Sequence, residues 1–200
     1  QSVAAWAART LVPGTGMILD ACCAPGGKTS LLRSRGHAVV AADLNPGKLH
    51  LAQGQWRALG LGSDAVAMDG RRPALGQGSM ALVLLDAPCT GTGLLSRRPE
   101  IKLRRTAEDV HRLANLQAEL LDSSAVLVRP GGHLLYSVCS VTRAEGRGQV
   151  EAFLRRNDAF GVVPADGVFP VDAVRDGMVT LWPHRHGTDG FFAALLQRRR

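Results

Sequence analysis

Short apolar runs, separated by segments with helical periodicity, recur along the first half of the chain. Runs of this length, bounded by turn residues, are typical of strands buried within a sheet. Those over residues 65–68 and 81–85 predict strands buried on both faces. An aspartate follows each run directly. We therefore expect four strands that end at Asp20, Asp43, Asp69 and Asp86.

Helical patterns lie between these runs and after them. Thr106 and Asp109 form a capping-box pattern before a long segment with one apolar side. Pro130, Gly131 and Gly132 are predicted to end that helix. We expect helices over residues 3–11, 27–36, 45–59, 106–127 and 145–156.

Three further apolar runs follow in the C-terminal part. Residues 133–139 predict a fifth strand, and residues 178–182 and 191–196 predict two strands joined by a Gly-containing loop, hence an antiparallel pair. Strands that alternate with helices predict an α/β fold with a mostly parallel sheet covered on both faces. The 200 residues contain no repeat and no linker, so we expect a single domain over residues 1–200.

The charge balance points toward a polyanionic partner. The chain has 24 Lys and Arg against 17 Asp and Glu, a formal net charge of +7, and such a surplus attracts polyanions over long range. A solvated basic surface without a partner is the alternative, because an aromatic content of 4% supplies few stacking platforms for bases. Nucleic acid therefore becomes a candidate partner.

The four cysteines, at positions 22, 23, 89 and 139, lack the spacing of a zinc site. In a chain of this size they favour a reduced, cytoplasmic protein without a bound metal. No apolar run reaches the roughly 18 residues of a membrane span, so we expect a soluble protein without membrane association. We also expect a monomer. The chain begins with Gln1 rather than Met, and we expect it to be part of a longer protein.

The segment from Asp20 to Thr29 lies where ligands bind in doubly wound sheets, between the first strand and the next helix. Its paired glycines allow close approach of the backbone to a ligand. A phosphate-binding P-loop would need glycine at position 22, and a GxGxxG fingerprint is absent. We therefore expect neither a nucleoside triphosphate nor a dinucleotide in this loop.

Asp43 and Asp69 are candidates for binding a nucleoside. Asp43 follows Gly26 by 17 positions, close to the offset at which an acidic residue binds ribose hydroxyl groups. A helix cap before Asn45 is the alternative. Asp69 is a candidate for the amino group of adenine, although an Asp-Gly pair is just as typical of a turn.

Cys89 and Cys139 both follow predicted strands, so they are expected at the same ligand-binding edge of the sheet. A single cysteine is more often a small core residue, but two at this edge favour chemistry. Methylation of a pyrimidine at C5 requires a nucleophile that first adds to C6, and a thiolate is suited to that step.

Four motifs occur in order over nearly the whole chain: Cys22-Cys23-Ala24-Pro25-Gly26-Gly27-Lys28-Thr29, Asp86-Ala87-Pro88-Cys89-Thr90-Gly91, Cys139-Ser140 and Asp189-Gly190-Phe191-Phe192. Together they resemble the Sun/Fmu (RsmB/NOP-type) ribosomal RNA cytosine-C5 methyltransferase family. The chain departs from the common pattern at Cys23 and Val138. The resemblance implies a class I (Rossmann-like) S-adenosylmethionine-dependent methyltransferase fold with seven strands.

The resemblance also implies roles for individual residues. Cys139 would be the nucleophile, Cys89 would help to release the product, and Asp86 would lie against the target base. Without the resemblance, Pro88-Cys89 would point to Cys89, because DNA cytosine methyltransferases use the cysteine of a Pro-Cys motif. S-adenosylmethionine would be surrounded by Cys22, Cys23, Ala24, Pro25, Gly26, Gly27, Lys28, Asp43, Asp69 and Asp86.

Basic residues crowd the segment after Cys89. We interpret them as contacts to the RNA backbone, with a solvated charge run as the alternative; they are Arg97, Arg98, Lys102, Arg104 and Arg105. The target base must leave its stack to reach a cysteine, so locally open RNA is expected. The resemblance favours 16S ribosomal RNA, recognised together with an RNA-binding domain before Gln1.

Two other functions stay open at this point. One is a methyltransferase that acts on DNA or on a small molecule. The other is a non-catalytic RNA-binding module that has kept the fold, although the presence of both Cys89 and Cys139 argues against it.

Overall fold

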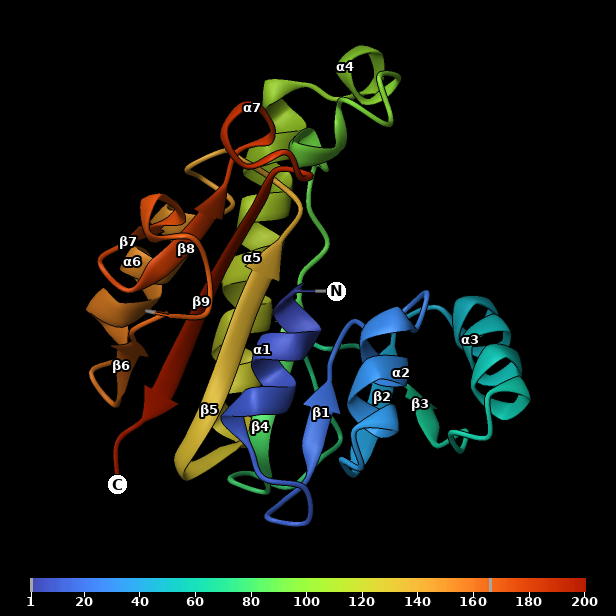
Figure 1. The fold of residues 1–200 in the computed structure, drawn as a ribbon. Helices are drawn as coiled ribbons and strands as arrows, with labels where there is room; N and C mark the ends of the chain where they lie inside the picture. The colour runs from blue at the N-terminus through green and yellow to red at the C-terminus, as the bar shows by residue number, and fades with distance from the viewer. Residues whose placement is uncertain (1, 166) are drawn as a thin grey trace.

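The computed structural model describes residues 2–165 and 167–200, which form one sheet between two layers of helices (Figure 1). The sheet order is β3-β2-β1-β4-β5-β9-β8-β7, and β6 pairs with β9. Within the described residues its strands are β1 (Ile18–Asp20), β2 (Val39–Asp43), β3 (Ala65–Ala67), β4 (Met80–Asp86), β5 (Val128–Val138), β6 (Phe160–Val163), β7 (Val174–Arg175), β8 (Met178–Leu181) and β9 (Phe191–Arg198).

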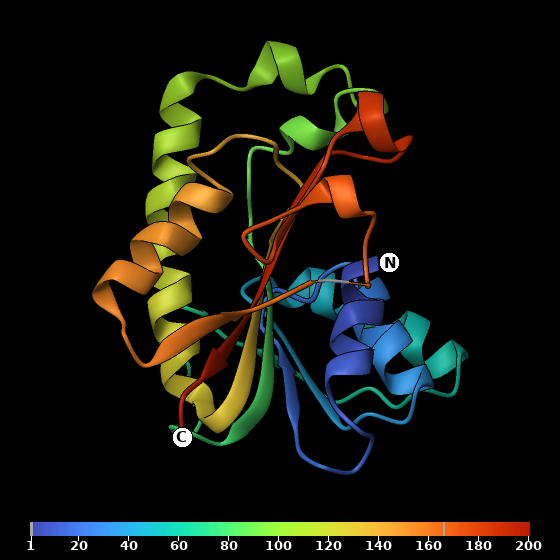
Figure 2. The same cartoon turned by 60° about the vertical axis from the view of Figure 1, so that its left-hand side comes forward.

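The helices cover both faces of this sheet, as Figure 2 shows with the sheet seen nearly edge-on. On one face lie α5 (Ala107–Leu127) and α6 (Arg147–Arg156), whose apolar residues pack with β4 and β5. On the other lie α1 (Ser2–Thr10) and α2 (Gly27–Ser34), and α3 (Pro46–Ala58) packs beside β2. The shorter helices are η1 (Thr92–Leu94), α4 (Ile101–Arg104), η2 (Val171–Ala173) and α7 (Pro183–His186). In the described part of the chain, no helix has the length and apolar character needed to span a membrane.

The strand order reverses next to β1, which pairs in parallel with both β2 and β4. The connection after β1 leads to β2 on one side, and the connection after β4 leads to β5 on the other side. This reversal opens a crevice at the carboxyl ends of the strands, where ligands bind in such sheets. The predicted Asp20 and Asp86 lie at these ends. The expected α/β fold is confirmed, but the sheet expected to be mostly parallel is mixed, with four parallel and four antiparallel pairings within the described residues.

The antiparallel half of the sheet is built around β9. This strand pairs with β5 along six residues, from His133 opposite Gln197 to Val138 opposite Phe192, and also with β8 and β6. The predicted antiparallel pair of β8 and β9 is confirmed. The expected total of seven strands is wrong, because the short strands β6 and β7 bring the sheet to nine within the described residues.

Two local expectations also require correction. Residues 65–68 were expected to be buried on both faces, but β3 is an edge strand in which Val66 is 38% exposed. The helix α5 does not end at Pro130, Gly131 and Gly132. It passes directly into β5, and these three residues lie in the irregular first part of that strand. The predicted capping box at Thr106 and Asp109 is confirmed.

Candidate functional site

The loop between β1 and α2 is shaped by glycine. Gly26 has φ = 102°, and its carbonyl accepts a 3.0 Å hydrogen bond from the indole N–H of Trp56. A Cβ atom at this position would lie 2.9 Å from the Trp56 ring. Only glycine combines the left-handed conformation with this close contact. The loop backbone is thereby held against α3, with the N-terminus of α2 facing the carboxyl ends of the strands.

Asp43 connects this loop to β2. One carboxylate oxygen accepts a 3.1 Å hydrogen bond from the backbone N–H of Ala24, and the other accepts one of 2.9 Å from that of Asn45. The helix cap of α3 is Asn45, whose side chain accepts from Lys48, so Asp43 does not itself cap the helix. The carboxylate is fixed at the end of β2, in direct contact with the glycine loop.

Asp20 lies beneath the same loop and is fully buried. Oδ2 accepts a 2.6 Å hydrogen bond from the Thr29 hydroxyl, whereas Oδ1 has no partner among the described residues. Burial raises the pKa of Asp20 to about 6, against the hydrogen bond from Thr29 and the nearby charge of Lys28. At neutral pH the loop therefore lies over a second carboxylate.

Lys28, in the first turn of α2, extends to the end of β4. Its ammonium group forms an ion pair with Asp86, whose other oxygen accepts a 2.7 Å hydrogen bond from the Ser137 hydroxyl. Burial acts to lower the pKa of Lys28, but the charge of Asp86 and the hydrogen bond to it outweigh burial and raise the pKa. The charge of Lys28 also acts on Cys139.

The thiols of Cys89 and Cys139 lie together, with 3.1 Å between their Sγ atoms, and both residues are partly exposed. The hydrogen bond from Cys89 is the main cause that lowers the pKa of Cys139; burial opposes it and Lys28 adds to it. The same hydrogen bond, followed by burial, raises the pKa of Cys89. The pair therefore favours a Cys139 thiolate that accepts a hydrogen bond from a neutral Cys89.

The surroundings of Cys22 and Cys23 differ from those of Cys89 and Cys139, although all four cysteines lie at the same end of the sheet. Burial, followed by the charge of Asp20, raises the pKa of Cys23 to about 12, and the same two causes raise the pKa of Cys22. These thiols stay protonated at neutral pH.

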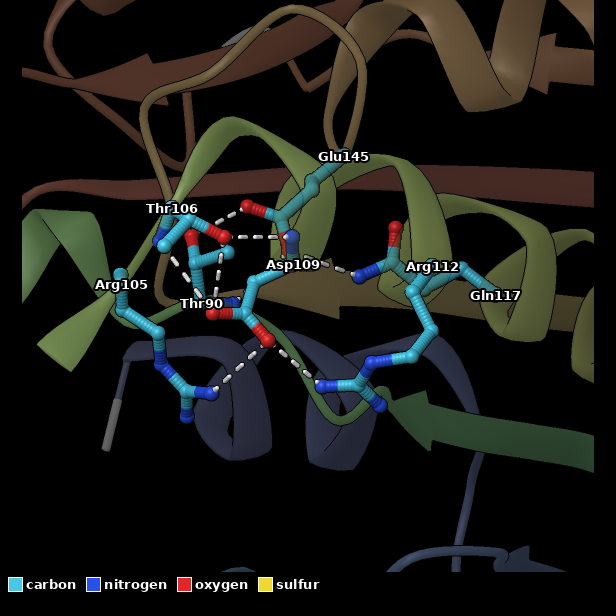
Figure 3. Close-up of polar contacts among 7 residues, drawn as sticks. All are labelled: Thr90, Arg105, Thr106, Asp109, Arg112, Gln117 and Glu145. Atoms are coloured by element: carbon cyan, nitrogen blue, oxygen red, sulfur yellow. Dashed lines mark hydrogen bonds and ion pairs between the residues drawn. The ribbon is translucent and has the colours of Figure 1, made fainter.

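Glu145 is a buried residue of this site that the sequence analysis missed. It lies just before α6, and its carboxylate binds Thr90 and Gln117, as Figure 3 shows. An acidic residue near a helix start is common at the surface, so nothing in the sequence marks it as buried. Its contacts depend on segments that only the fold brings together.

The loop after Cys89 also meets the Asp189-Gly190 motif. The backbone of Gly190 donates to the carbonyl of Gly93 at 2.8 Å, and a Cβ atom on Gly93 would lie 1.9 Å from the Gly190 oxygen. Arg97 forms a bidentate ion pair with Asp189. All four motifs identified in the sequence therefore lie at one end of the sheet.

Asp69 has the turn role that was the alternative in the sequence analysis. Its backbone carbonyl accepts from the N–H of Arg72, and its carboxylate is bound by the guanidinium of Arg71. The hydrogen bonds from Arg71 lower the pKa of Asp69 to about 2. A ligand at Asp69 would therefore share this carboxylate with Arg71.

The basic segment after Cys89 forms α4 and the residues around it, at the same end of the molecule as α7 (Figure 1). Arg105 lies 3.9 Å from Asp109, which also binds Arg112 (Figure 3). Arg98, Lys102 and Arg104 are exposed and have no ion pair within the described residues. Of the five basic side chains predicted to contact RNA, these three are available to a polyanion, whereas Arg97 and Arg105 lie against Asp189 and Asp109.

The glycine loop fits the cofactor that the sequence predicts, S-adenosylmethionine. Its sulfonium is a cation, and Asp20, Asp43 and Asp86 all act electrostatically on Cys22 in this loop. The buried Oδ1 of Asp20 still lacks a donor among the described residues. Within residues 2–165 and 167–200, no group of three or more His, Cys, Asp or Glu side chains is placed to hold a metal ion.

The chain is similar in sequence to known methyltransferases. A Mycobacterium tuberculosis methyltransferase is 44% identical over 200 residues, covering 96% of this chain and 43% of the relative. Ribosomal RNA small subunit methyltransferase B of Thermus thermophilus is 40% identical over 181 residues, covering 90% of this chain and 44% of the relative. The chain thus spans less than half the length of these relatives.

Solved structures give the same picture of the fold. NSun6 from Pyrococcus horikoshii, crystallised with SFG, superimposes with a TM-score of 0.86 at 28% identity, covering all of this chain and 51% of that one. The fold is that of S-adenosylmethionine-dependent methyltransferases. Residues 10–197 match the family described as 16S rRNA methyltransferase RsmB/F, and the chain belongs to that family.

Proposed function

We propose that this chain is the catalytic domain of an RNA (cytosine-C5)-methyltransferase that acts on 16S ribosomal RNA. The proposal depends most on the 3.1 Å distance between the Sγ atoms of Cys89 and Cys139, at the ends of two neighbouring strands. The family description and the relatives named ribosomal RNA small subunit methyltransferase B support RNA as the substrate.

Cys139 is the proposed nucleophile. Its lowered pKa increases the fraction of thiolate, and the ammonium of Lys28 stabilises that charge. Attack of the thiolate on C6 of cytosine forms an S–C6 bond and moves the π electrons of the C5–C6 bond toward C5. C5 thereby becomes nucleophilic enough to accept a methyl group. Asp86, held by Lys28 and Ser137, is proposed to stabilise the protonated ring.

Cys89 is the proposed base for product release. After methylation, the proton on C5 must leave before the C5–C6 double bond can form again and the S–C6 bond can break. The main cause of the raised pKa of Cys89 is its hydrogen bond to Cys139, and this cause disappears once Cys139 is bonded to carbon. Cys89 can then ionise and take the C5 proton while Cys139 leaves as a thiolate.

The methyl donor is assigned to the glycine loop. S-adenosylmethionine carries its methyl group on a sulfonium cation, which favours a site lined by carboxylates. The residues proposed to surround it are Cys22, Cys23, Ala24, Pro25, Gly26, Gly27 and Lys28 of the loop, with Asp43 toward the ribose, Asp69 toward the adenine and Asp86 between cofactor and base. The two hydrogen bonds that Asp43 accepts leave further lone pairs for ribose hydroxyl groups.

The RNA is proposed to approach across α4. Arg98, Lys102 and Arg104 are exposed there, in a chain whose formal net charge is +7. The target cytosine must be unstacked to reach Cys139, so an open segment of RNA suits this site. Recognition of one particular cytosine is assigned to an RNA-binding domain before Gln1 in a longer parent protein.

A substrate panel tests this proposal. Purified protein is incubated with labelled S-adenosylmethionine and, in parallel, 16S ribosomal RNA, DNA or a small-molecule extract. We expect label in RNA only, and bisulfite sequencing should locate it at the C5 of cytosine. Label in DNA or in a small molecule would favour another methyltransferase activity. Calorimetry that shows no binding of S-adenosylmethionine would favour a non-catalytic RNA-binding module.

A further inference from the structure

We propose that Glu145 is a positioning residue that fixes the distance between the two cysteine thiols, because its carboxylate binds the residue that follows each of them. This inference rests on the proposed function only for its catalytic consequence. The geometric part concerns how two loops are held and can be tested without methyl transfer.

The hydrogen bonds of Glu145 divide between its two oxygens. Oε1 accepts from the backbone N–H of Thr90 at 2.8 Å and from the side-chain amide of Gln117 at 3.2 Å. Oε2 accepts from the hydroxyls of Ser140 at 2.7 Å, Thr142 at 3.1 Å and Thr90. Thr90 follows Cys89 and Ser140 follows Cys139, so one carboxylate connects the two cysteine loops.

Burial of this carboxylate lowers the free energy of unfolding unless the carboxylate is well hydrogen-bonded. Glu145 has no exposed surface, and none of its contacts among the described residues is with a Lys or Arg side chain. A buried carboxylate without a cation is tolerated when several donors surround it. All five of its donors come from the two cysteine loops and α5.

Neighbouring contacts fix Glu145 and the two loops further. The hydroxyl of Tyr136, in the core of β5, donates to the backbone carbonyl of Glu145 at 2.5 Å. The side chain of Gln117 also donates to the carbonyl of Pro88 at 2.9 Å, directly before Cys89 (Figure 3 shows Gln117 beside Glu145). The N–H of Gly93 donates to the carbonyl of Cys139 at 3.1 Å. Glu145 therefore lies at the centre of a connected hydrogen-bond network.

The test compares Glu145→Gln and Glu145→Ala with a matched control, Gln149→Ala. Gln149 is also a buried polar residue of the same segment, but its side chain binds the backbone carbonyls of Ala114 and Ala144 and contacts neither Thr90 nor Ser140, the residues that follow the two cysteines. The glutamine variant keeps the shape of Glu145. Its amide nitrogen accepts no hydrogen bond, so the donors at one of the two carboxylate oxygens lose their acceptor.

The first readout is geometric. Diamide oxidises two adjacent thiols to a disulfide and is itself reduced to the hydrazine, and mass spectrometry measures the Cys89–Cys139 linked peptide over time. We expect disulfide formation to slow about 10-fold in Glu145→Gln and more in Glu145→Ala, because small displacements of reacting atoms have large effects on rate. Gln149→Ala should match the unmodified chain. Thermal unfolding identifies any variant that fails to fold. If Glu145→Ala does not fold, the comparison is made with Glu145→Gln alone.

The second readout is catalytic and uses RNA and S-adenosylmethionine. We expect Glu145→Gln to lower kcat about 10- to 100-fold with little change in the KM for RNA. Equal disulfide rates in Glu145→Gln and Gln149→Ala would overturn the inference. A slowed disulfide rate in a protein that methylates no RNA would support the geometric role of Glu145 while the proposed function fails.

Discussion

Two pairs of cysteines lie at the same end of the sheet and differ in chemistry. Burial and nearby carboxylates raise the pKa of both Cys22 and Cys23. At Cys139 a hydrogen bond from Cys89 and the charge of Lys28 lower the pKa in spite of burial. The difference shows that neighbouring charges and donors, rather than position at the sheet edge alone, make a cysteine suitable as a nucleophile.

The two pairs also divide the site by charge. The glycine loop lies against Asp20 and Asp43, an arrangement that favours a cation such as a sulfonium. The Cys89–Cys139 pair lies beside Lys28, which favours an anion. Asp86 contacts Lys28 and therefore lies between the two halves.

The largest difference between the two pairs should appear when one cysteine of each pair is replaced by serine. Cys139→Ser should lower methyl transfer at least about 1000-fold, because a serine hydroxyl is a poor nucleophile when no base activates it. Cys22→Ser should lower the rate far less than Cys139→Ser, because Cys22 stays protonated and is not suited to act as the nucleophile. Initial rates with labelled S-adenosylmethionine measure both variants. Similar losses in the two variants would remove the distinction between the pairs.

Removal of the Lys28 ammonium group should have the next largest effect. Lys28→Met removes the ion pair with Asp86 and the charge that favours the Cys139 thiolate, and we expect kcat to fall about 100-fold. Lys48→Met is the control, because Lys48 is exposed on α3. Steady-state kinetics with RNA measure both. An equal response of the two variants would contradict the role given to Lys28.

Asp43→Asn should weaken binding of S-adenosylmethionine about 10-fold. The amide supplies one acceptor oxygen instead of two, so either Ala24 or the ribose loses a hydrogen bond. Asp64→Asn, at an exposed position before β3, should leave the Kd unchanged. Calorimetry gives both constants, and an unchanged Kd in Asp43→Asn would exclude this aspartate as a ribose ligand.

The smallest effect concerns the pH dependence of Cys139. Its pKa lies below the ordinary value for cysteine because Cys89 donates a hydrogen bond. Cys89→Ala removes that donor, so the pKa of Cys139 should rise. The rate of alkylation of Cys139 by iodoacetamide, followed from pH 6 to 10, should then show its midpoint at higher pH. A shift to lower pH would show that Cys89 does not stabilise the thiolate.

The sequence was sufficient for the features that depend on local pattern. Strand ends at Asp20, Asp43 and Asp86 follow from apolar runs that a buried strand requires. Cys89 and Cys139 follow strands four and five, and parallel neighbours bring their carboxyl ends together. Their proximity could therefore be predicted, although the 3.1 Å distance could not.

Features that depend on distant segments could not be predicted. The exposure of Val66 results from the edge position of β3, and the sequence of a single strand does not specify its place in the sheet. Glu145 is buried because Thr90, 55 positions away, supplies two of its donors. The strand β7 has only two residues, which is too few to give an alternating pattern.

The covalent step at Cys139 is the central claim, and one measurement tests it directly. Cys89→Ala protein is incubated with 16S ribosomal RNA and S-adenosylmethionine, digested, and analysed by mass spectrometry for peptides that carry a nucleotide. We predict that an adduct accumulates on Cys139, because the base that removes the C5 proton is missing. An adduct on Cys22 or Cys23, or product formation in Cys139→Ala at the rate of the unmodified chain, would contradict the account.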